Sequence, residues 1–167
     1  MLTKAEFLDS CAQEIRVIKH LATKVPRGGL SYRPTPVQRT TTQLLQYLST
    51  AAIVPARAMV TGAWDDFEAV EKAEAALDVE DFAAAMDAQE RDLRALIGPI
   101  PDADFASKDA TLPWGVSQKL GAALVNTVLK SLVAYRMQLF LYAKAAGNHD
   151  LGPANCWVGV DAPAKNP

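Results

Sequence analysis

The 167-residue sequence contains few of the side chains that build metal centres and disulfide frameworks. It has two histidines and two cysteines, Cys11 and Cys156, and the cysteines lie near opposite ends of the chain. Their separation fits neither a Cys-x-x-Cys motif nor a zinc knuckle, and no disulfide framework is implied. Because Cys11 falls on the apolar side of a helical pattern, we expect it to be a buried and unreactive thiol.

Long apolar runs and clustered positive charge are also missing. No window approaches the about 20 uninterrupted apolar residues of a membrane-spanning helix, and the net charge is −2. Residues 61–110 carry four Lys or Arg against fourteen Asp or Glu, a balance unsuited to binding nucleic-acid phosphates. We therefore expect contact with neither membranes nor nucleic acids. The first residues lack a basic and then apolar leader, which predicts a cytoplasmic protein.

What remains is the composition of a globular protein. Half of the residues are hydrophobic and 22% are charged, and the length is below the roughly 250 residues at which chains usually divide. We expect a single domain over residues 1–167. Within it, residues 62–77 form an acidic excursion that is either a short helix or a mobile segment. Residues 148–167 form a tail that we expect to fold back on the domain through Trp157, with burial of its indole.

Two capping boxes mark the first helices. Thr3 with Glu6 opens a helix that we expect to run over residues 4–24, and Thr40 with Gln43 opens a second. Proline removes a backbone donor and clashes with the preceding turn. We therefore expect Pro55 to kink or break the second helix.

Two further helices complete the pattern. One is expected after Asp78 and stops at Gly98-Pro99, and the other covers residues 117–146. Residues 99–113 contain three prolines and are expected to form a non-helical connection. Since no strand pattern of comparable strength exists, the sequence predicts an all-α protein, a four-helix bundle with at least one long connection.

The last helix is apolar nearly all round, which predicts that it is buried. A polar line nevertheless runs along one face of it, at the spacing i, i+4, i+7 and i+11; its members are Ser131, Tyr135, Gln138 and Tyr142. A similar line on the second helix contains Tyr47. Buried hydroxyls and amides need hydrogen-bond partners. The two lines therefore find these partners in one another, in a row of water molecules or in a ligand. In the alternative interpretation, the second-helix line grazes solvent and the tyrosines pack their rings while their hydroxyls reach the surface.

Three segments that include these residues resemble the DinB/YfiT-like superfamily. They are Tyr32-Arg33-Pro34-Thr35-Pro36 leading into Arg39–Leu48, then Leu112-Pro113-Trp114-Gly115, and finally Ala134–Gly147 with the sequence AYRMQLFLYAKAAG. The resemblance implies a four-helix bundle of up-down-down-up topology with long connections, often dimeric. It also implies an ancestral site in which three histidines hold zinc or nickel, a metal that some relatives use to activate a small thiol.

The family's histidine positions are occupied by other residues here. The Leu-Leu-x-His-Leu pattern reads Leu44-Leu45-Gln46-Tyr47-Leu48, and the His-x-x-x-His-Arg-x-Gln-Leu pattern has Ser131 and Tyr135 in place of its histidines. A serine hydroxyl is a poor ligand, and a tyrosine must first lose a proton of pKa near 10. His20 is expected to be at the surface or partly packed, and His149 to be exposed. We therefore expect no metal and no cofactor.

We interpret the chain as a DinB-like protein without the family's metal site, which binds a small molecule or a partner and forms a homodimer. The candidate pocket consists of Tyr47, Ser131, Tyr135 and Gln138. Two alternatives are enzymes: a thiol-dependent transferase or isomerase that uses tyrosine in place of metal, and a transferase that has kept a divalent metal. A third is a homodimeric scaffold with no pocket. Arg136 is expected at the helix surface or in an interhelix ion pair rather than in a phosphate clamp.

Overall fold

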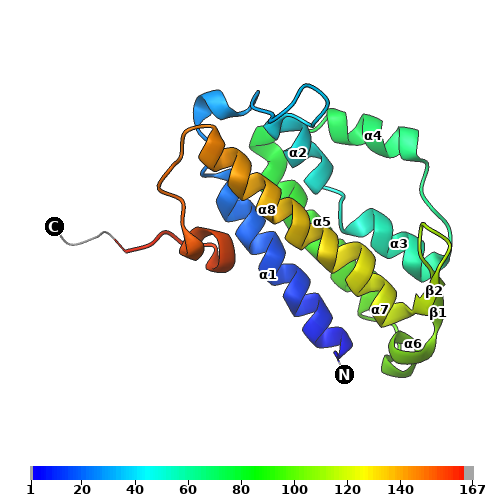
Figure 1. The fold of residues 1–167 in the computed structure, drawn as a ribbon. Coiled ribbons are helices and arrows are strands. Elements are labelled where there is room, and N and C mark those ends of the chain that lie inside the picture. The colour runs from blue at the N-terminus through cyan, green and yellow to red at the C-terminus, as the bar shows by residue number, and fades with distance from the viewer. Residues whose placement is uncertain (1, 164–167) are drawn as a thin grey trace.

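The computed structural model describes residues 2–163 and is mostly helical (Figure 1). Its α-helices are α1 (Lys4–Ala22), α2 (Thr41–Leu48), α3 (Ile53–Thr61), α4 (Phe67–Ala75), α5 (Phe82–Ile97), α6 (Asp102–Ser107), α7 (Leu120–Leu124) and α8 (Lys130–Ala145). A π-helical turn, Val125–Leu129, joins α7 to α8. The strands of the described residues are β1 (Asp109–Thr111) and β2 (Ser117–Lys119). The prediction of an all-α protein is confirmed in this sense, since the sheet is small.

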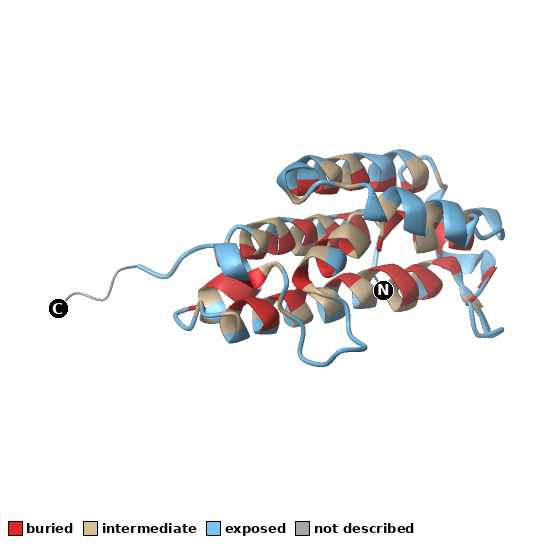
Figure 2. Cartoon of the chain, turned by 90° about the horizontal axis from the view of Figure 1, so that it is seen from above, coloured by how far each residue is buried: buried red, intermediate tan, exposed pale blue. Residues whose placement is uncertain are grey.

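The longer helices lie side by side around one core (Figure 1). Helix α1 lies along α8 and α5, α2 lies beside α8 and α5, and α3 lies beside α5, α7 and the π-helical turn. Helices α1, α7 and α8 run in one direction, and α2, α3 and α5 run in the other. Figure 2 shows that buried residues face the interior of this arrangement and exposed residues face outward. None of the helices within residues 2–163 is long and apolar enough to span a bilayer.

The two capping boxes form as the sequence predicts. The side chain of Thr3 accepts a hydrogen bond from the Glu6 amide, and the Glu6 carboxylate accepts one from the Thr3 amide. Thr40 and Gln43 form the same reciprocal pair. Each box satisfies amides that have no partner within the helix, which fixes where α1 and α2 begin.

The second predicted helix breaks earlier than Pro55. Helix α2 ends at Leu48 and α3 begins at Ile53, so Pro55 lies in the first turn of α3, where proline is tolerated because no intrahelical donor is lost. The buried side chain of Gln89 in α5 bridges the break. Its amide nitrogen donates to the Leu48 carbonyl at 2.9 Å, and its oxygen accepts from the amides of Ala52 and Ile53 at 2.8 and 3.1 Å.

The connection expected to be non-helical contains structure. Helix α6 and strand β1 lie within residues 99–113, and β1 pairs antiparallel with β2 in the register Asp109 to Lys119. The final helix therefore begins at Leu120 rather than at residue 117. Three-residue strands carry no pattern of their own, because they form only when the partner strand supplies the hydrogen bonds.

The acidic excursion contains α4. The Asp66 side chain caps it by accepting hydrogen bonds from the amides of Glu68 and Ala69. No residue of α4 is buried. A 3-10 turn, Val79–Asp81, then leads into α5, and Asp78 caps this turn rather than α5 itself.

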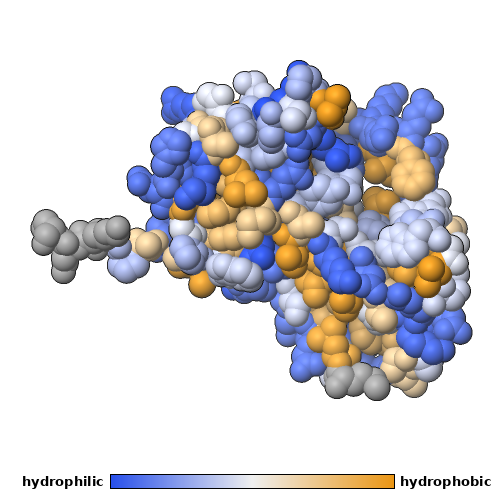
Figure 3. All heavy atoms as spheres, viewed as in Figure 1, coloured by the Kyte–Doolittle hydropathy of each residue, from blue (hydrophilic) through white to orange (hydrophobic). Residues whose placement is uncertain are grey.

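The expectation that the last helix is buried all round is wrong. Val133, Met137 and Leu141, spaced four residues apart on α8, are 38%, 36% and 54% exposed. Figure 3 shows apolar surface on the face of the molecule formed by α8 and α1. A helix with apolar residues on every side need not be surrounded when it lies at the edge of the core.

The C-terminal segment returns to α1 and α8. Its π-helical turn, Ala154–Val158, packs on α1, and the Trp157 carbonyl accepts a hydrogen bond from Gln13. The expected burial of the Trp157 indole is wrong, because this side chain is 63% exposed and only one face of its ring is covered, by Arg136. The guanidinium of Arg136 is buried beneath this segment, with its Nε 2.9 Å from Oε2 of Glu14 in α1. Arg136 is thus an interhelix ion-pairing residue. Residues 164–167 of the predicted tail lie outside the described residues.

Candidate functional site

A cavity of about 280 Å³ lies between the α2–α3 region, α4, the loop between β1 and β2, and the π-helical turn before α8. Its polar lining includes Arg39, Tyr47, Thr50, Glu71, Glu74 and Ser131. Val54, Pro55 and Val70 supply apolar surface. Pockets for small organic ligands begin near about 300 Å³ and are mainly apolar with a few polar groups. The cavity therefore suits a compact organic molecule.

Tyr47, which lines the cavity, contacts Tyr135, which does not. Their ring centroids are 4.8 Å apart and the planes are inclined by 64°, an edge-to-face contact between α2 and α8. Burial raises the pKa of the Tyr47 hydroxyl, and the neighbouring Tyr135 hydroxyl raises it further. Tyr47 therefore keeps its proton at neutral pH and presents a neutral phenol to the cavity.

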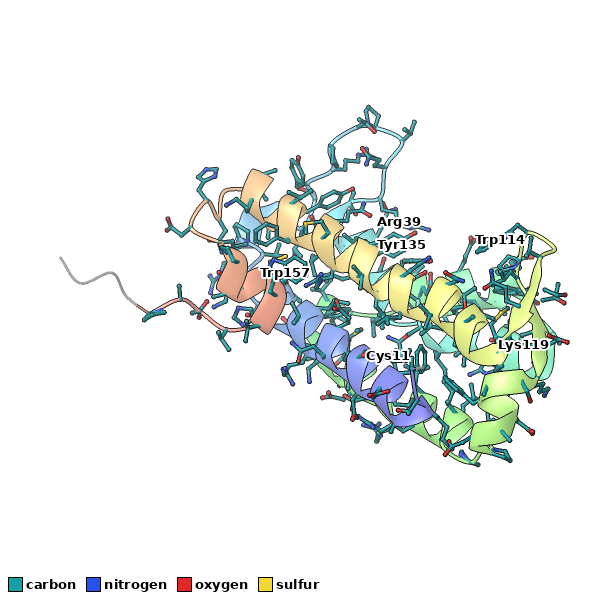
Figure 4. All side chains as sticks on the ribbon, turned by 60° about the horizontal axis from the view of Figure 1, so that its bottom comes forward. Cys11, Arg39, Trp114, Lys119, Tyr135 and Trp157 are labelled. Carbon is teal, nitrogen blue, oxygen red and sulfur yellow. The ribbon has the colours of Figure 1, made fainter. Side chains whose placement is uncertain are left out.

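Arg39 also contacts the ring of Tyr47. Its guanidinium carbon lies 4.2 Å from the centroid of the Tyr47 ring, in a cation–π contact. Figure 4 shows the labelled Arg39 and Tyr135, which both contact Tyr47, and Trp114 on the loop between the strands. The face of Tyr47 is thus already occupied by a cation of the chain.

Ser131 lines the cavity with its hydroxyl partly committed. The hydroxyl donates to the Thr127 carbonyl at 2.7 Å, and the Thr127 hydroxyl donates to the Ala123 carbonyl at 2.8 Å. These bonds follow the helix through the π-helical turn, where the regular backbone ladder is interrupted. Ser131 can still accept a hydrogen bond from a ligand, because a hydroxyl oxygen has two lone pairs.

Gln138 does not line the cavity. Its amide donates to the Tyr142 hydroxyl at 2.7 Å, and that hydroxyl donates to the Arg39 carbonyl at 3.3 Å. The Tyr142 ring also meets Tyr32 edge to face, with centroids 5.4 Å apart. The structure therefore brings Tyr47, Ser131 and Tyr135 together and places Gln138 in a network that holds the segment leading to Arg39.

The acidic wall of the cavity is a feature that sequence reasoning missed. Glu71 and Glu74 line it from α4, and the Thr50 hydroxyl donates to the Glu74 carboxylate. Burial raises the pKa of Glu74, whereas the hydrogen bond from Thr50 and the charge of Arg39 oppose this shift. The signal in the sequence was the three-residue spacing of these glutamates, which places both on one face of a helix.

Aromatic side chains form the rim. Trp64 and Phe67 stack with centroids 5.6 Å apart and planes inclined by 28°. Trp114 comes from a different segment, the turn between β1 and β2. In this turn Gly115 adopts a φ of 83°, which residues with a side chain disfavour. The rings of Trp64, Phe67 and Trp114 all line the cavity, although they come from two separate segments of the sequence.

The three positions at which the resemblance expects histidines do not suit a transition metal. Tyr47 is held as a neutral phenol, Ser131 donates to a backbone carbonyl, and zinc and nickel favour imidazole or thiolate ligands. Within residues 2–163, no three His, Cys, Asp or Glu side chains are grouped so that they could hold a metal ion.

The two histidines lie outside the cavity lining. His20 is partly buried against the C-terminal segment, with its Nε2 3.1 Å from the Asn155 amide nitrogen and 3.7 Å from an Asp161 oxygen. Burial lowers the pKa of His20, Lys24 lowers it further, and Asp161 opposes both. His149 is exposed. Neither position provides an imidazole near Tyr47.

The sequence matches no model of a protein family and no curated protein.

Proposed function

We propose that the protein is a DinB/YfiT-like four-helix bundle whose metal site has been replaced by a pocket for a small organic molecule. The observation that carries the proposal is the cavity of about 280 Å³ lined by Tyr47 and Ser131 and backed by Tyr135. These are the three positions at which the resemblance expects metal ligands, and they come from two helices far apart in sequence.

The order of the long helices supports the same assignment. Helix α1 runs in one direction, α2–α3 and α5 run in the other, and α7–α8 returns to the first. This corresponds to the up-down-down-up order of the family, with α4 and the α6–β1–β2 segment as the long connections. The short elements α4 and α6 are then additions to the bundle rather than members of it.

A binding function accounts for the site better than tyrosine catalysis does. A general acid or base works best when its pKa lies near the working pH. Burial and Tyr135 raise the pKa of Tyr47, which moves it away from neutrality. A neutral phenol that keeps its proton is suited to donating a hydrogen bond to a bound molecule.

The three tryptophans provide a direct test. Trp64 and Trp114 line the cavity, whereas Trp157 lies over Arg136 elsewhere in the structure. In a fragment screen followed by two-dimensional NMR, we expect binders to shift the indole N–H signals of Trp64 and Trp114 and to leave that of Trp157 unchanged. A screen in which no binder shifts the first two signals would contradict the proposal.

A blocking variant gives an independent test. Ser131→Phe places a ring in the cavity, and Val133→Phe places the same ring on the exposed side of α8. We expect the first to abolish fragment binding and the second to preserve it, with circular dichroism as the check on folding. Equal binding by both variants would count against the cavity as the site.

A homodimer belongs to the same proposal. The exposed apolar residues Val133, Met137 and Leu141 of α8 would be buried by a second copy of the chain. Sedimentation should give the mass of a dimer for the natural sequence and of a monomer for Met137→Glu. A monomer at all concentrations of the unaltered protein would exclude this part.

A further inference from the structure

Three of the four exposed tryptophan and phenylalanine rings of the described residues gather at one place, and the fourth, Trp157, covers Arg136. Trp64, Phe67 and Trp114 are 38%, 58% and 62% exposed, and all three line the cavity. Large aromatic side chains are costly to leave in water and are usually covered. Aromatic faces gathered at the mouth of a cavity attract cations, best when the cation carries apolar groups that are weakly hydrated.

The charge of the cavity has the sign that such a ligand needs. Glu71 and Glu74 contribute two negative charges, and Arg39 contributes one positive charge. Among residues 2–163, neither glutamate forms an ion pair with a lysine or arginine. The guanidinium of Arg39 is instead placed over Tyr47. One net negative charge therefore remains in the lining.

The environment of Glu74 favours a positively charged partner beside its carboxylate. The carboxylate is half-buried and accepts a hydrogen bond from Thr50, but burial still disfavours its charged form. A cation placed beside it would restore the stabilisation that water no longer supplies. The same carboxylate would repel an anion in the cavity.

We propose that the cavity selects a small organic monocation, an amine or a quaternary ammonium with an apolar body, over neutral and anionic molecules of the same shape. The cationic group lies between the aromatic rim and the carboxylates of Glu71 and Glu74, and the body lies against Val54, Pro55 and Val70. This inference rests on the proposed ligand-binding function and adds the chemical class of the ligand.

Three probes of similar shape and different charge test the proposal. Benzyltrimethylammonium is a cation, benzyl methyl sulfone is neutral and benzylsulfonate is an anion. In titrations followed by the indole signals of Trp64 and Trp114, we expect the cation to bind at least about tenfold more tightly than the sulfone. The sulfonate should bind more weakly than the sulfone.

A pair of variants on one helix assigns the selectivity. Glu74→Gln removes a charge that lines the cavity, and Glu68→Gln removes one that lies on the same helix but outside the lining. The first should weaken binding of the cation by roughly fivefold to tenfold and leave the sulfone nearly unchanged. The second should change neither. Trp114→Ala, at an exposed turn, should also weaken binding of the cation.

The outcomes separate this inference from the function on which it rests. If the sulfone or the sulfonate binds as tightly as the cation, the proposed selectivity for a monocation is wrong, while the proposal of a small-molecule pocket still holds. Binding of none of the three would also overturn it, and the fragment screen with Ser131→Phe would then decide the pocket itself. An equal loss of affinity in Glu74→Gln and Glu68→Gln would show that the overall negative charge of α4, and not the carboxylate of Glu74 in the cavity, attracts the cation, which would contradict the proposal.

Discussion

The guanidinium carbon of Arg136 lies 4.7 Å from the centre of the Trp157 ring, so an exposed side chain of the C-terminal segment covers a buried charge of α8. Arg136 is 2% exposed. Its Nε is 2.9 Å from Oε2 of Glu14, but the N–H is not directed at that oxygen, so the contact is electrostatic rather than a well-formed hydrogen bond. Burial raises the pKa of Glu14, and the charge of Arg136 opposes the shift.

Breaking this pair from one side should cost more than removing both partners. We expect Arg136→Met to lower the free energy of unfolding by about 3–5 kcal/mol, because it leaves the Glu14 carboxylate without its buried partner. The double variant Arg136→Met with Glu14→Leu should recover most of the loss. Urea unfolding measures both, and Arg91→Met, at an exposed position, is the control. A double variant less stable than Arg136→Met would contradict this account.

Gln89 should be essential to the break between α2 and α3. Its side chain satisfies the Leu48 carbonyl and the amides of Ala52 and Ile53 in a buried setting. Gln89→Leu keeps the size and removes these bonds, so we expect a loss of about 2–3 kcal/mol in the free energy of unfolding. Arg91→Leu, on the exposed side of the same helix, should change it little. Comparable stability for the two variants would refute the bridging role.

The two cysteines should differ in how they become reactive. Burial raises the pKa of Cys11 to about 12, and it also raises that of Cys156, where Arg136 opposes the shift. Both thiols should therefore react slowly with a disulfide reagent at pH 8 in the folded protein. Trp157→Ala should accelerate labelling of Cys156 and not of Cys11. Cys11→Ser and Cys156→Ser identify which thiol reacts, and faster labelling of Cys11 would count against the covering role of Trp157.

Acid should weaken the contact between α1 and the C-terminal segment through His20. The pKa of His20 is lowered by burial and by Lys24, so below its ordinary value of 6.5 the unfolded chain binds a proton that the folded protein does not. Stability contributed by neutral His20 is thus present above pH 6.5 and lost as the pH falls toward the lowered pKa.

Comparison of unfolding at pH 7.5 and pH 5.5 tests this sign. The natural protein should lose more stability between these values than His20→Gln does. His149→Gln, which alters an exposed histidine, should behave as the natural protein. If His20→Gln shows the same pH dependence as the natural sequence, the histidine does not contribute to it.

The parts of the fold that follow from neighbouring residues were predictable. Thr3 with Glu6 and Thr40 with Gln43 determine helix starts through bonds over three residues, and both starts are where the sequence places them. The pairing of β1 with β2 and the exposure of Val133, Met137 and Leu141 depend on what lies opposite them in space. No local pattern contains that information.

The candidate site divides in the same way. Tyr47, Ser131 and Tyr135 could be named because each occupies a position in a short motif, and the structure brings them together. Glu74 could not, since its role depends on a contact with Thr50 in a different element. Gln138 shares the periodicity of Ser131 and Tyr135, but its amide is engaged by Tyr142.

The π-helical turn at Val125–Leu129 has a consequence for the geometry of the last helix. Such a turn amounts to one extra residue, and each residue of an α-helix advances the direction of the side chains by about 100°. Everything after Leu129 is therefore rotated by that angle relative to a regular continuation of α7. Deleting a single residue here would let a regular α-helix continue with Ser131 and Tyr135 still directed at Tyr47, whereas converting the turn into regular α-helix at full length would turn both away and present a different side of α8 to the second helix.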